Sequence, residues 1–435
     1  MSKSTLAVIG CGKLGAPLVA CLAHAGHTVI GIDTNQELIQ NLKANKITWS
    51  EPNLVEYLEK YKSQISFEST YSHTFNEVTT TFIIVPTPST RSGEYSIDFV
   101  LAAMKSIGDK LNKINFDTHT IVIVSTVMPG DTEGRITSTL NESLGKKSER
   151  VSICYSPEFI ALGSVIKNLQ NPDSILIGQP NEKAGSELQE LLLSIVVNQP
   201  KVLRMTTTEA EIAKIAINSY VTTKISFSNQ ISEICERVPG ASAENVLRAI
   251  GADTRIGISY LKQGTSYGGP CFPRDNRAFA KYAENLGINL NIAHATDDVN
   301  NRQQARLVTI LNKVAPDARN ILIVGMSYKK DTDVYEESPA LKFINENTTY
   351  NYFVFDDHVS KVYDYNRLTF VTEKKLTENN LSIDVAILFV PSDSYAKIPE
   401  YLADDALLID FWGNWSGYRN SKSKAYLKIG EYIAY

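Results

Sequence analysis

The chain has 435 residues and carries 43 Lys or Arg against 48 Asp or Glu, so its formal net charge is −5. At roughly 150 residues per domain, this length predicts two or three domains. The mild acidity argues against a generally basic nucleic-acid surface, although it leaves room for a local basic pocket.

No apolar run approaches the ~18 residues that a membrane helix needs, and the N-terminus lacks the order of segments that marks a signal peptide. The five cysteines are widely spaced and never form CxxC; they are Cys11, Cys21, Cys154, Cys235 and Cys271. We therefore expect no disulfide framework and no metal site, no membrane or nucleic-acid partner, and a cytoplasmic location.

Short segments rich in Val, Ile and Thr alternate with helical stretches through the first two hundred residues. They are Leu6–Ile9, Thr28–Asp33, Thr81–Val85, Thr120–Ser125 and Ser174–Gly178. This rhythm predicts βαβ units and a parallel sheet.

Around Thr206 the pattern becomes helical. Thr208 and Glu211 have the spacing of a capping box, and the helix continues to about Arg237 before Pro239-Gly240. A further long helix is expected over roughly 293–313.

Strand patterns return at Asn320–Val324, Tyr352–Asp356, Val385–Val390 and Ala406–Phe411. The fold class is therefore α/β, with an N-terminal Rossmann-type domain, a central long-helix domain and a second Rossmann-like domain. We place their bounds at 1–205, 206–300 and 301–435.

Gly10-Cys11-Gly12-Lys13-Leu14-Gly15 has the form GxGxxG and lies between an expected strand and an expected helix. In that context Gly10 permits the turn, Gly12 admits the pyrophosphate and Gly15 lets helix and strand pack closely. Asp33 ends the next strand and suits the adenine ribose hydroxyls. Because no Arg follows Asp33, NAD is favoured over NADP; the alternative is a structural βαβ unit without cofactor.

Lys214 lies within an almost wholly apolar helical run, and Asn218 follows four residues later on the same face. Such a helix is expected to be buried on most faces. Lys214 either extends its ammonium to a polar edge or, with Asn218, faces an oxygen that becomes negative during reaction.

Cys271 follows Gly268-Gly269-Pro270 and precedes a helix that ends near Leu286-Gly287, with Pro273 and Asp275 in its first turn. A thiolate is stabilised at a helix N-terminus and can act as a nucleophile. The alternative is an inert buried cysteine.

Four segments together resemble the UDP-glucose/GDP-mannose dehydrogenase family: Gly-Gly-Pro-Cys-Phe-Pro-Arg-Asp at 268–275, Glu-Ala-Glu-Ile-Ala-Lys-Ile-Ala-Ile-Asn at 209–218, Ser156-Pro157-Glu158-Phe159 and Ser125-Thr126-Val127. They stand in the family's order, and the resemblance extends from the Gly10 loop to about Pro339. It implies an NAD-dependent, four-electron oxidation of the C6 alcohol of a nucleotide sugar to a carboxylate.

By this resemblance Cys271 attacks the intermediate aldehyde, Lys214 and Asn218 stabilise the oxyanion, and Glu158 manages protons and water with Thr126. Asp275 matches the family's aspartate beside the cysteine. Pro86, Thr87, Thr126 and Glu158 join the glycine loop and Asp33 as cofactor contacts. The substrate contacts would be Phe159, Lys214, Asn218, Arg255, Tyr260, Lys262, Gly268 and Lys329, with Arg255 donated across a dimer interface.

Two positions depart from the family. Glu336 stands where relatives carry the Arg of Arg-Glu-Ser, and Trp412 stands where they often carry the Arg of Asp-Gly-Arg. Both replacements remove a cation that would contact a phosphate or the substrate.

The resemblance favours a homodimeric UDP-glucose dehydrogenase. The alternatives are an enzyme for a UDP-N-acetylhexosamine or GDP-mannose, and a nucleotide-binding homologue with poor turnover. A two-electron hydroxyacid dehydrogenase would have no use for Cys271.

Overall fold

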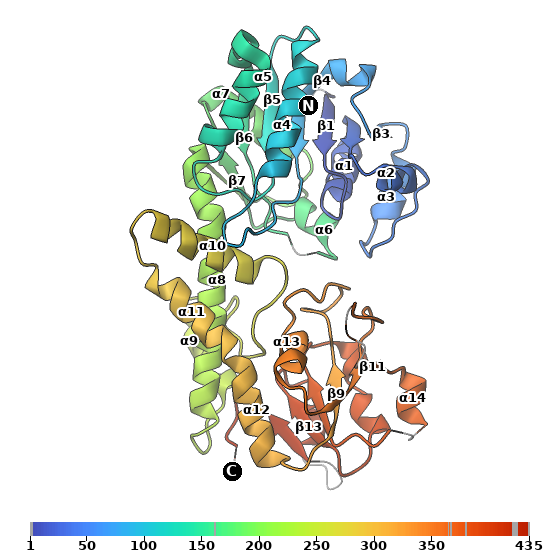
Figure 1. Ribbon diagram of the computed structural model, residues 1–435, viewed down its shortest axis with the longest axis vertical. Coiled ribbons are helices and arrows are strands. Elements are labelled where there is room, and N and C mark those ends of the chain that lie inside the picture. Colours follow the sequence, from blue (N-terminus) through green and yellow to red (C-terminus); the bar gives the residue numbers. More distant parts are fainter. Residues whose placement is uncertain are drawn as a thin grey trace. The chain divides into compact units, whose positions relative to one another are not determined.

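The computed structural model describes residues 3–160, 162–363, 365, 368–378, 381–419 and 425–433. The chain folds into two compact units, Met1–Ala216 and Ile217–Tyr435. Helix α8 (Thr207–Cys235) runs through the boundary between them, as Figure 1 shows. Each unit contains its own sheet.

The sheet of the first unit has the strand order β3-β2-β1-β4-β5-β6-β7-β8. Its strands are β1 (Thr5–Ile9), β2 (Thr28–Ile32), β3 (Ile65–Glu68), β4 (Val78–Ile83), β5 (His119–Ile123), β6 (Val151–Tyr155), β7 (Ser174–Gly178) and β8 (Lys201–Met205). Neighbours are parallel except for β6 and β7. The order 3-2-1-4-5-6 of the first six strands is that of a Rossmann fold, which confirms the fold predicted for the N-terminal part.

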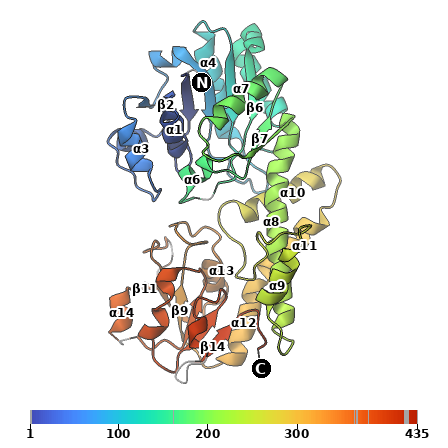
Figure 2. The ribbon, with the colours of Figure 1, turned by 180° about the vertical axis from the view of Figure 1, so that it is seen from behind.

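Helices cover both faces of this sheet (Figures 1 and 2). On one face, Leu6 and Val8 of β1 belong to a core shared with α1 (Gly15–His24), α3 (Leu54–Lys60), α6 (Val165–Gln170) and α7 (Glu182–Leu193). On the other face, Ala7 and Ile9 pack with α4 (Asp98–Asn112) and α5 (Thr137–Leu144). Successive strand residues point to opposite faces, so a strand covered on both sides is apolar throughout.

The second unit contains a parallel sheet in the order β11-β10-β9-β12-β13-β14. Its strands are β9 (Asn320–Val324), β10 (Asn351–Phe355), β11 (Leu368–Phe370), β12 (Val385–Leu388), β13 (Leu407–Asp410) and β14 (Tyr426–Lys428). Helices α12 (Gln303–Val314), α13 (Pro339–Glu346) and α14 (Glu373–Thr377) share its core. The unit also holds α9 (Ala243–Ala252), α10 (Phe272–Asn285) and α11 (Asn291–Asn301). The second α/β region predicted from the sequence is thus confirmed.

Two local predictions were wrong. The helix expected over 293–313 is interrupted at Arg302, whose ψ of −4° departs from helical geometry, so α11 and α12 are separate. The capping box is formed by Thr206 and Glu209: the Thr206 amide donates to the Glu209 carboxylate (2.9 Å), and the Glu209 amide donates to the Thr206 hydroxyl (3.3 Å). Glu211 instead accepts hydrogen bonds from the amides of Gly130 and Thr132.

Most of α8 is buried or half-buried, as expected from the sequence, but one side of the helix is exposed in the single chain. Ile217 is 44% exposed, Tyr220 66%, Phe227 45% and Ile234 58%. These exposed apolar residues lie on one side of the helix, whereas its buried side also carries polar residues such as Asn218, Ser219 and Asn229.

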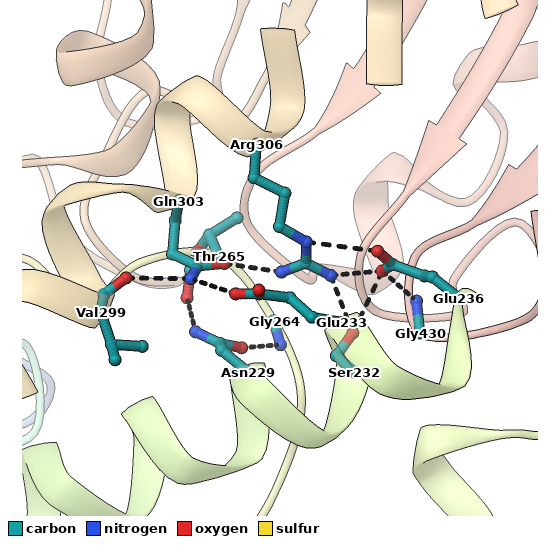
Figure 3. A network of polar contacts seen from close by, with 10 residues as sticks. All are labelled: Asn229, Ser232, Glu233, Glu236, Gly264, Thr265, Val299, Gln303, Arg306 and Gly430. Carbon is teal, nitrogen blue, oxygen red and sulfur yellow. Dashed lines mark hydrogen bonds and ion pairs between the residues drawn. The ribbon is translucent and has the colours of Figure 1, made fainter. Parts of the chain in front are cut away.

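A buried polar network joins the C-terminal end of α8 to α12 and to the last described residues (Figure 3). Arg306 of α12 forms an ion pair with Glu236, donating from Nε over 3.2 Å. Glu236 also accepts from the Gly430 amide (2.9 Å), and its backbone carbonyl accepts from Ile433 (3.0 Å). Glu236 is only 3% exposed, so its charge depends on these donors rather than on water.

We expect Arg306→Met to destabilise the second unit by about 3–5 kcal/mol, because it leaves the Glu236 carboxylate buried without its cation. Calorimetric unfolding would measure the effect, with Arg302→Met, at an exposed position one turn earlier, as the control. Equal losses in the two variants would contradict this role of the ion pair.

Candidate active site

The first unit gathers most predicted cofactor residues at one edge of its sheet. Gly10 follows β1, Pro86 and Thr87 follow β4, Thr126 follows β5, and Glu158 follows β6. These four strands are parallel neighbours, so their carboxyl ends meet at the same edge. The point between β1 and β4 is where ligands bind in such sheets.

The glycine turn has the close backbone approaches that its sequence predicted. Gly10 has φ +93°, and a Cβ there would lie 2.2 Å from the carbonyl oxygen of Ile84. A Cβ on Gly15 would lie 1.7 Å from the carbonyl oxygen of Gly10. Apart from its chain neighbours, no heavy atom of the described residues lies within 4 Å of the position that a Cβ on Gly12 would take, which leaves that side of the turn open.

Helix α1 begins directly after this turn, and Leu14 at its N-cap supplies no side-chain hydrogen bond. The amides of the first turn are thus suited to a phosphate. Asp33 accepts hydrogen bonds from the amides of Cys11 (2.8 Å) and Asn35 (2.9 Å), which places its carboxylate beside the turn. Together the open face at Gly12, the helix start and the carboxylate fit a dinucleotide.

Ser125 ties the ends of β4 and β5 together. Its hydroxyl donates to the Val85 carbonyl (2.7 Å) and accepts from the Val85 amide (2.9 Å). This pairing fixes the backbone between Pro86 and Thr126. Thr87 is buried, whereas Pro86 is exposed.

Lys214 is nearly buried, at 7% exposure, and its ammonium donates to the backbone carbonyl of Glu158 over 2.7 Å. The same ammonium lies 4.5 Å from the ring centroid of Phe159. The Lys214 ammonium therefore binds groups of the protein and does not extend into solvent. The contact brings three predicted site residues together.

Desolvation raises the pKa of the Glu158 carboxyl to about 7, although the positive charge of Lys214 acts in the opposite direction. A carboxyl with this pKa exchanges its proton near neutral pH, as a general acid or base must.

The second unit holds the cysteine turn. Gly268 and Gly269 run against the loop after β9: a Cβ on Gly268 would lie 2.2 Å from the Glu337 carbonyl oxygen, and the Gly269 amide donates to the Glu336 carbonyl (3.0 Å). Cys271 is the N-cap residue of α10 and has an exposed side chain. Asp275, 1% exposed, accepts from the Asn218 amide group over 2.7 Å.

All five cysteines lie in described segments, and the four others are buried. Burial raises the pKa of the Cys21 and Cys154 thiols to about 12. Neither can supply a thiolate at neutral pH. Cys271 is thus the cysteine that can meet a substrate.

The predicted substrate residues are less closely grouped. Arg255 pairs with Asp253 (2.6 Å) and has an 86% exposed side chain. Tyr260 adopts φ +63°, and its ring meets Phe272 edge-on. The Lys329 ammonium lies 5.8 Å from the Tyr328 ring centroid, and that ring packs on Gly269.

Glu336 and Trp412, the two positions that depart from the family, both lie beside the loop 264–269 that precedes Cys271. The side chain of Glu336 is exposed. The Trp412 ring lies against Gly264, where a Cβ would be 2.4 Å from it. The Lys262 ammonium lies 5.7 Å from the Trp412 ring centroid, and the indole donates to the Phe389 carbonyl (3.0 Å).

Several residues that hold the cysteine turn were not found from the sequence. Tyr267 donates its hydroxyl to Asp297 (2.7 Å), and Asn300 bonds the Tyr267 backbone. Their one available signal was the spacing of Thr296, Asn300 and Gln304, which places three polar residues on one helical face.

The fold, the glycine turn and the carboxylate after β2 define a dinucleotide-binding protein of the dehydrogenase class. Two family profiles match its sequence: the NAD binding domain of the UDP-glucose/GDP-mannose dehydrogenase family at residues 4–196, and the central domain of that family at residues 208–302. The chain belongs to the UDP-glucose/GDP-mannose dehydrogenase family, and NAD is its cofactor.

Two relatives are identical to this chain at just under a third of the aligned residues. It is 31% identical over 343 residues to the UDP-glucose 6-dehydrogenase AglM of Haloferax volcanii, covering 78% of this chain and 79% of that protein. The UDP-glucose 6-dehydrogenase YwqF of Bacillus subtilis is 32% identical over 340 residues, covering 77% and 75%.

Solved structures agree in fold. A UDP-glucose dehydrogenase from Pyrobaculum islandicum superimposes with a TM-score of 0.88 at 27% identity, covering 99% of this chain and 98% of that one. A UDP-D-ManNAc dehydrogenase from Pyrococcus horikoshii has a TM-score of 0.81 at 20% identity, covering 98% and 99%.

Among the described residues, no helix combines the length and apolar character needed to cross a membrane. Within that same part of the chain, no cluster of three or more His, Cys, Asp or Glu side chains could hold a metal ion.

We expect Glu158→Gln to become more stable relative to the parent protein as pH rises from about 4.5 to 7. The folded state holds the Glu158 proton more tightly than the unfolded chain does, so the parent loses stability through this window, whereas Gln does not titrate. The difference in melting temperature, measured across pH 4–8, should flatten above pH 7. Glu142→Gln, at an exposed site, is the control; a pH-independent difference for Glu158→Gln would contradict the raised pKa.

Proposed function

We propose that this protein oxidises the C6 alcohol of UDP-glucose to the carboxylate of UDP-glucuronate, using two NAD per sugar. The matched relatives named above are UDP-glucose 6-dehydrogenases. The spelling Cys-Phe-Pro-Arg-Asp at 271–275 also resembles that branch of the family. We assign 1–205 to NAD, 206–300 to the central helices and 301–435 to the nucleotide sugar.

The observation that carries the proposal is the position of Cys271, an exposed thiol at the start of the 14-residue helix α10. Oxidation of an alcohol to an acid passes through an aldehyde, whose carbon must add a nucleophile before a second hydride can leave. A thiolate provides that route by forming a covalent bond to the aldehyde carbon. A two-electron dehydrogenase has no such requirement.

NAD, when bound, accepts the hydride in each of the two oxidations. In the first, Glu158 takes the proton of the C6 hydroxyl, directly or through water, as its pKa near 7 allows. Cys271 then adds to the aldehyde to give a thiohemiacetal, and the loss of its second hydride and hydroxyl proton gives a thioester. Water attacks the thioester carbon, the carbon–sulfur bond breaks, and the products are the carboxylate and the thiol.

We assign the oxyanion of the thiohemiacetal to Lys214 and Asn218, which lie one helical turn apart on α8. The Asn218 amide group donates a hydrogen bond to the Asp275 carboxylate over 2.7 Å, which orients the Asn218 side chain. Thr126 follows β5 at the edge of the sheet that also carries Glu158. We assign Thr126 to assist Glu158 in holding the water that hydrolyses the thioester. Tyr260, Lys262, Gly268, Phe159 and Lys329 would contact the sugar nucleotide.

Glu336 and Trp412 favour a second candidate, a homologue that acts on another nucleotide sugar or turns over slowly. An exposed carboxylate at 336 repels a phosphate where relatives offer an arginine, and Trp412 offers a ring in place of a charge. Neither position is among the residues to which we assign the reaction, which include Cys271, Glu158 and Asn218.

We further propose a homodimer formed through α8. Tyr220, Phe227 and Ile234 are exposed and stand seven residues apart, which aligns them as one apolar stripe. Arg255, exposed in one chain, would then be available to the partner's site.

UDP-glucose should yield two NADH per sugar, followed at 340 nm, because the proposed reaction removes four electrons. UDP-N-acetylglucosamine and GDP-mannose are the comparison substrates, and faster turnover of either would reassign the sugar. One NADH per UDP-glucose would contradict the acid product, and none with any sugar would favour the slow homologue.

Cys271→Ser should lower turnover by at least about a thousandfold, since an alcohol is a far weaker nucleophile than a thiolate at neutral pH. Cys235→Ser, at a buried thiol, is the control and should retain turnover. Full activity in the Cys271 variant would remove this residue from the nucleophile role.

Phe227→Glu should convert the dimer to monomer, because it places a charge in the centre of the apolar stripe. Light scattering after size exclusion would measure the mass. Leu286→Glu, at a residue 60% exposed after α10, should leave the mass unchanged. An unaltered dimer in Phe227→Glu would place the interface elsewhere.

A further inference from the structure

Tyr267, four residues before Cys271, is held at three points by helix α11. Its amide donates to Asn300 Oδ1 (2.7 Å), and Asn300 Nδ2 donates to its carbonyl (3.1 Å). Its hydroxyl donates to Asp297 Oδ1 over 2.7 Å. Asn300 is 3% exposed and Tyr267 5%, so water does not compete for these bonds.

A residue that follows Cys271 also donates to Asp297 Oδ1. Asn276, in the second turn of α10, donates from Nδ2 to Asp297 Oδ1 (3.2 Å) and to the Ala293 carbonyl (2.9 Å). Its own Oδ1 accepts from the Ser219 hydroxyl of α8 (2.7 Å). Asp297 therefore connects the residues that precede Cys271 to those that follow it.

A second asparagine repeats the backbone pairing further upstream (Figure 3). Asn229 of α8 accepts from the Gly264 amide (3.1 Å) and donates to the Thr265 carbonyl (3.2 Å). Gln304 donates to the Ser266 hydroxyl (2.9 Å). Each residue from 264 to 267 thus has a polar contact with α8, α11 or α12.

These contacts flank two residues that have no side chains to anchor the turn. Gly268 and Gly269 are held through their backbone, in which the Gly269 amide donates to the Glu336 carbonyl (3.0 Å), and ordering a glycine backbone is costly in entropy. A nucleophile must be held near its attack geometry, since a displacement of about 1 Å can cost roughly a hundredfold in rate. The polar contacts on both sides of the turn supply the restraint that the glycines cannot.

We propose that Asp297 and Asn300 are positioning residues that hold Cys271 in its reactive place by clamping Tyr267 and Asn276. The proposal rests on the nucleophile role of Cys271 given above. Burial and the negative charge of Asp297 both raise the pKa of the Tyr267 hydroxyl, so the hydroxyl remains a donor across the working range of pH.

Tyr267→Phe removes one oxygen and tests the clamp with the least disturbance. We expect kcat to fall about tenfold while KM for NAD stays within about twofold, because the cofactor residues lie in the other unit. The alkylation rate of Cys271 by iodoacetamide should change severalfold, read by mass spectrometry on the one exposed cysteine. A merely structural residue would lower the melting temperature without altering alkylation well below it.

Asp297→Asn and Asn300→Asp extend the test, with Asp298→Asn and Asn301→Asp as controls at exposed neighbours on α11. The double variant Tyr267→Phe/Asp297→Asn should be no slower than the slower single variant, because the Tyr267 hydroxyl acts through its hydrogen bond to Asp297. Parental kcat and alkylation in Tyr267→Phe would overturn the proposal, as would additive losses in the double variant. Cys271→Ser is assayed alongside: its full turnover would refute the nucleophile, whereas a parental Tyr267→Phe beside an inactive Cys271→Ser would refute only the clamp.

Discussion

In each unit, a glycine turn depends on backbone segments that approach each other more closely than any side chain allows. In the first unit, a Cβ on Gly10 would lie 2.2 Å from the carbonyl oxygen of Ile84. In the second, a Cβ on Gly268 would lie at the same distance from the Glu337 carbonyl oxygen. Atoms cannot overlap to this extent, so glycine at these positions is a condition for the turns to exist. The turns in turn place the start of α1 and the start of α10, where a phosphate and a thiolate are stabilised.

This constraint explains which parts were predictable. A glycine required by close approach is visible in the sequence, and so is the alternation of apolar strands with helices; the Rossmann strand order and the second α/β region followed from them. The clamp formed by Asp297 and Asn300 was not visible, because nothing in a helical segment shows which loop will pack against it. The capping box was placed two residues too late for a similar reason: both Thr-x-x-Glu pairs fit the pattern, and only the contact of Glu211 with Gly130 and Thr132 separates them.

The exposed stripe of α8 was not predicted from the sequence, and this too has a physical cause. A helix with apolar residues on all sides is expected to be buried, but its sequence does not show whether the same chain or a second molecule covers each side. Ile217, Tyr220, Phe227 and Ile234 remain exposed in one chain, while Asn229 and Ser219 of the same helix bond to the cysteine loop and to α10. One helix therefore presents an apolar stripe on one side and a polar set of anchors on the other. The overall composition of the helix does not distinguish these two sides.

The net charge of −5 does not by itself exclude an anionic substrate. The two positions at which an arginine of the family is replaced, Glu336 and Trp412, are not among the residues assigned to the reaction. At residue 336 it is the backbone carbonyl that accepts from Gly269, so the turn is maintained whichever side chain the residue carries. At residue 412 the ring packs on Gly264 and lies beside Lys262. Trp412 thus replaces the arginine of relatives with an apolar ring, and Lys262 supplies a positive charge next to that ring. The hydrogen bonds described for the cysteine turn and for Glu158 are made by other side chains, so the effect proposed for these two positions is on how a phosphate or sugar is held and not on the reacting groups.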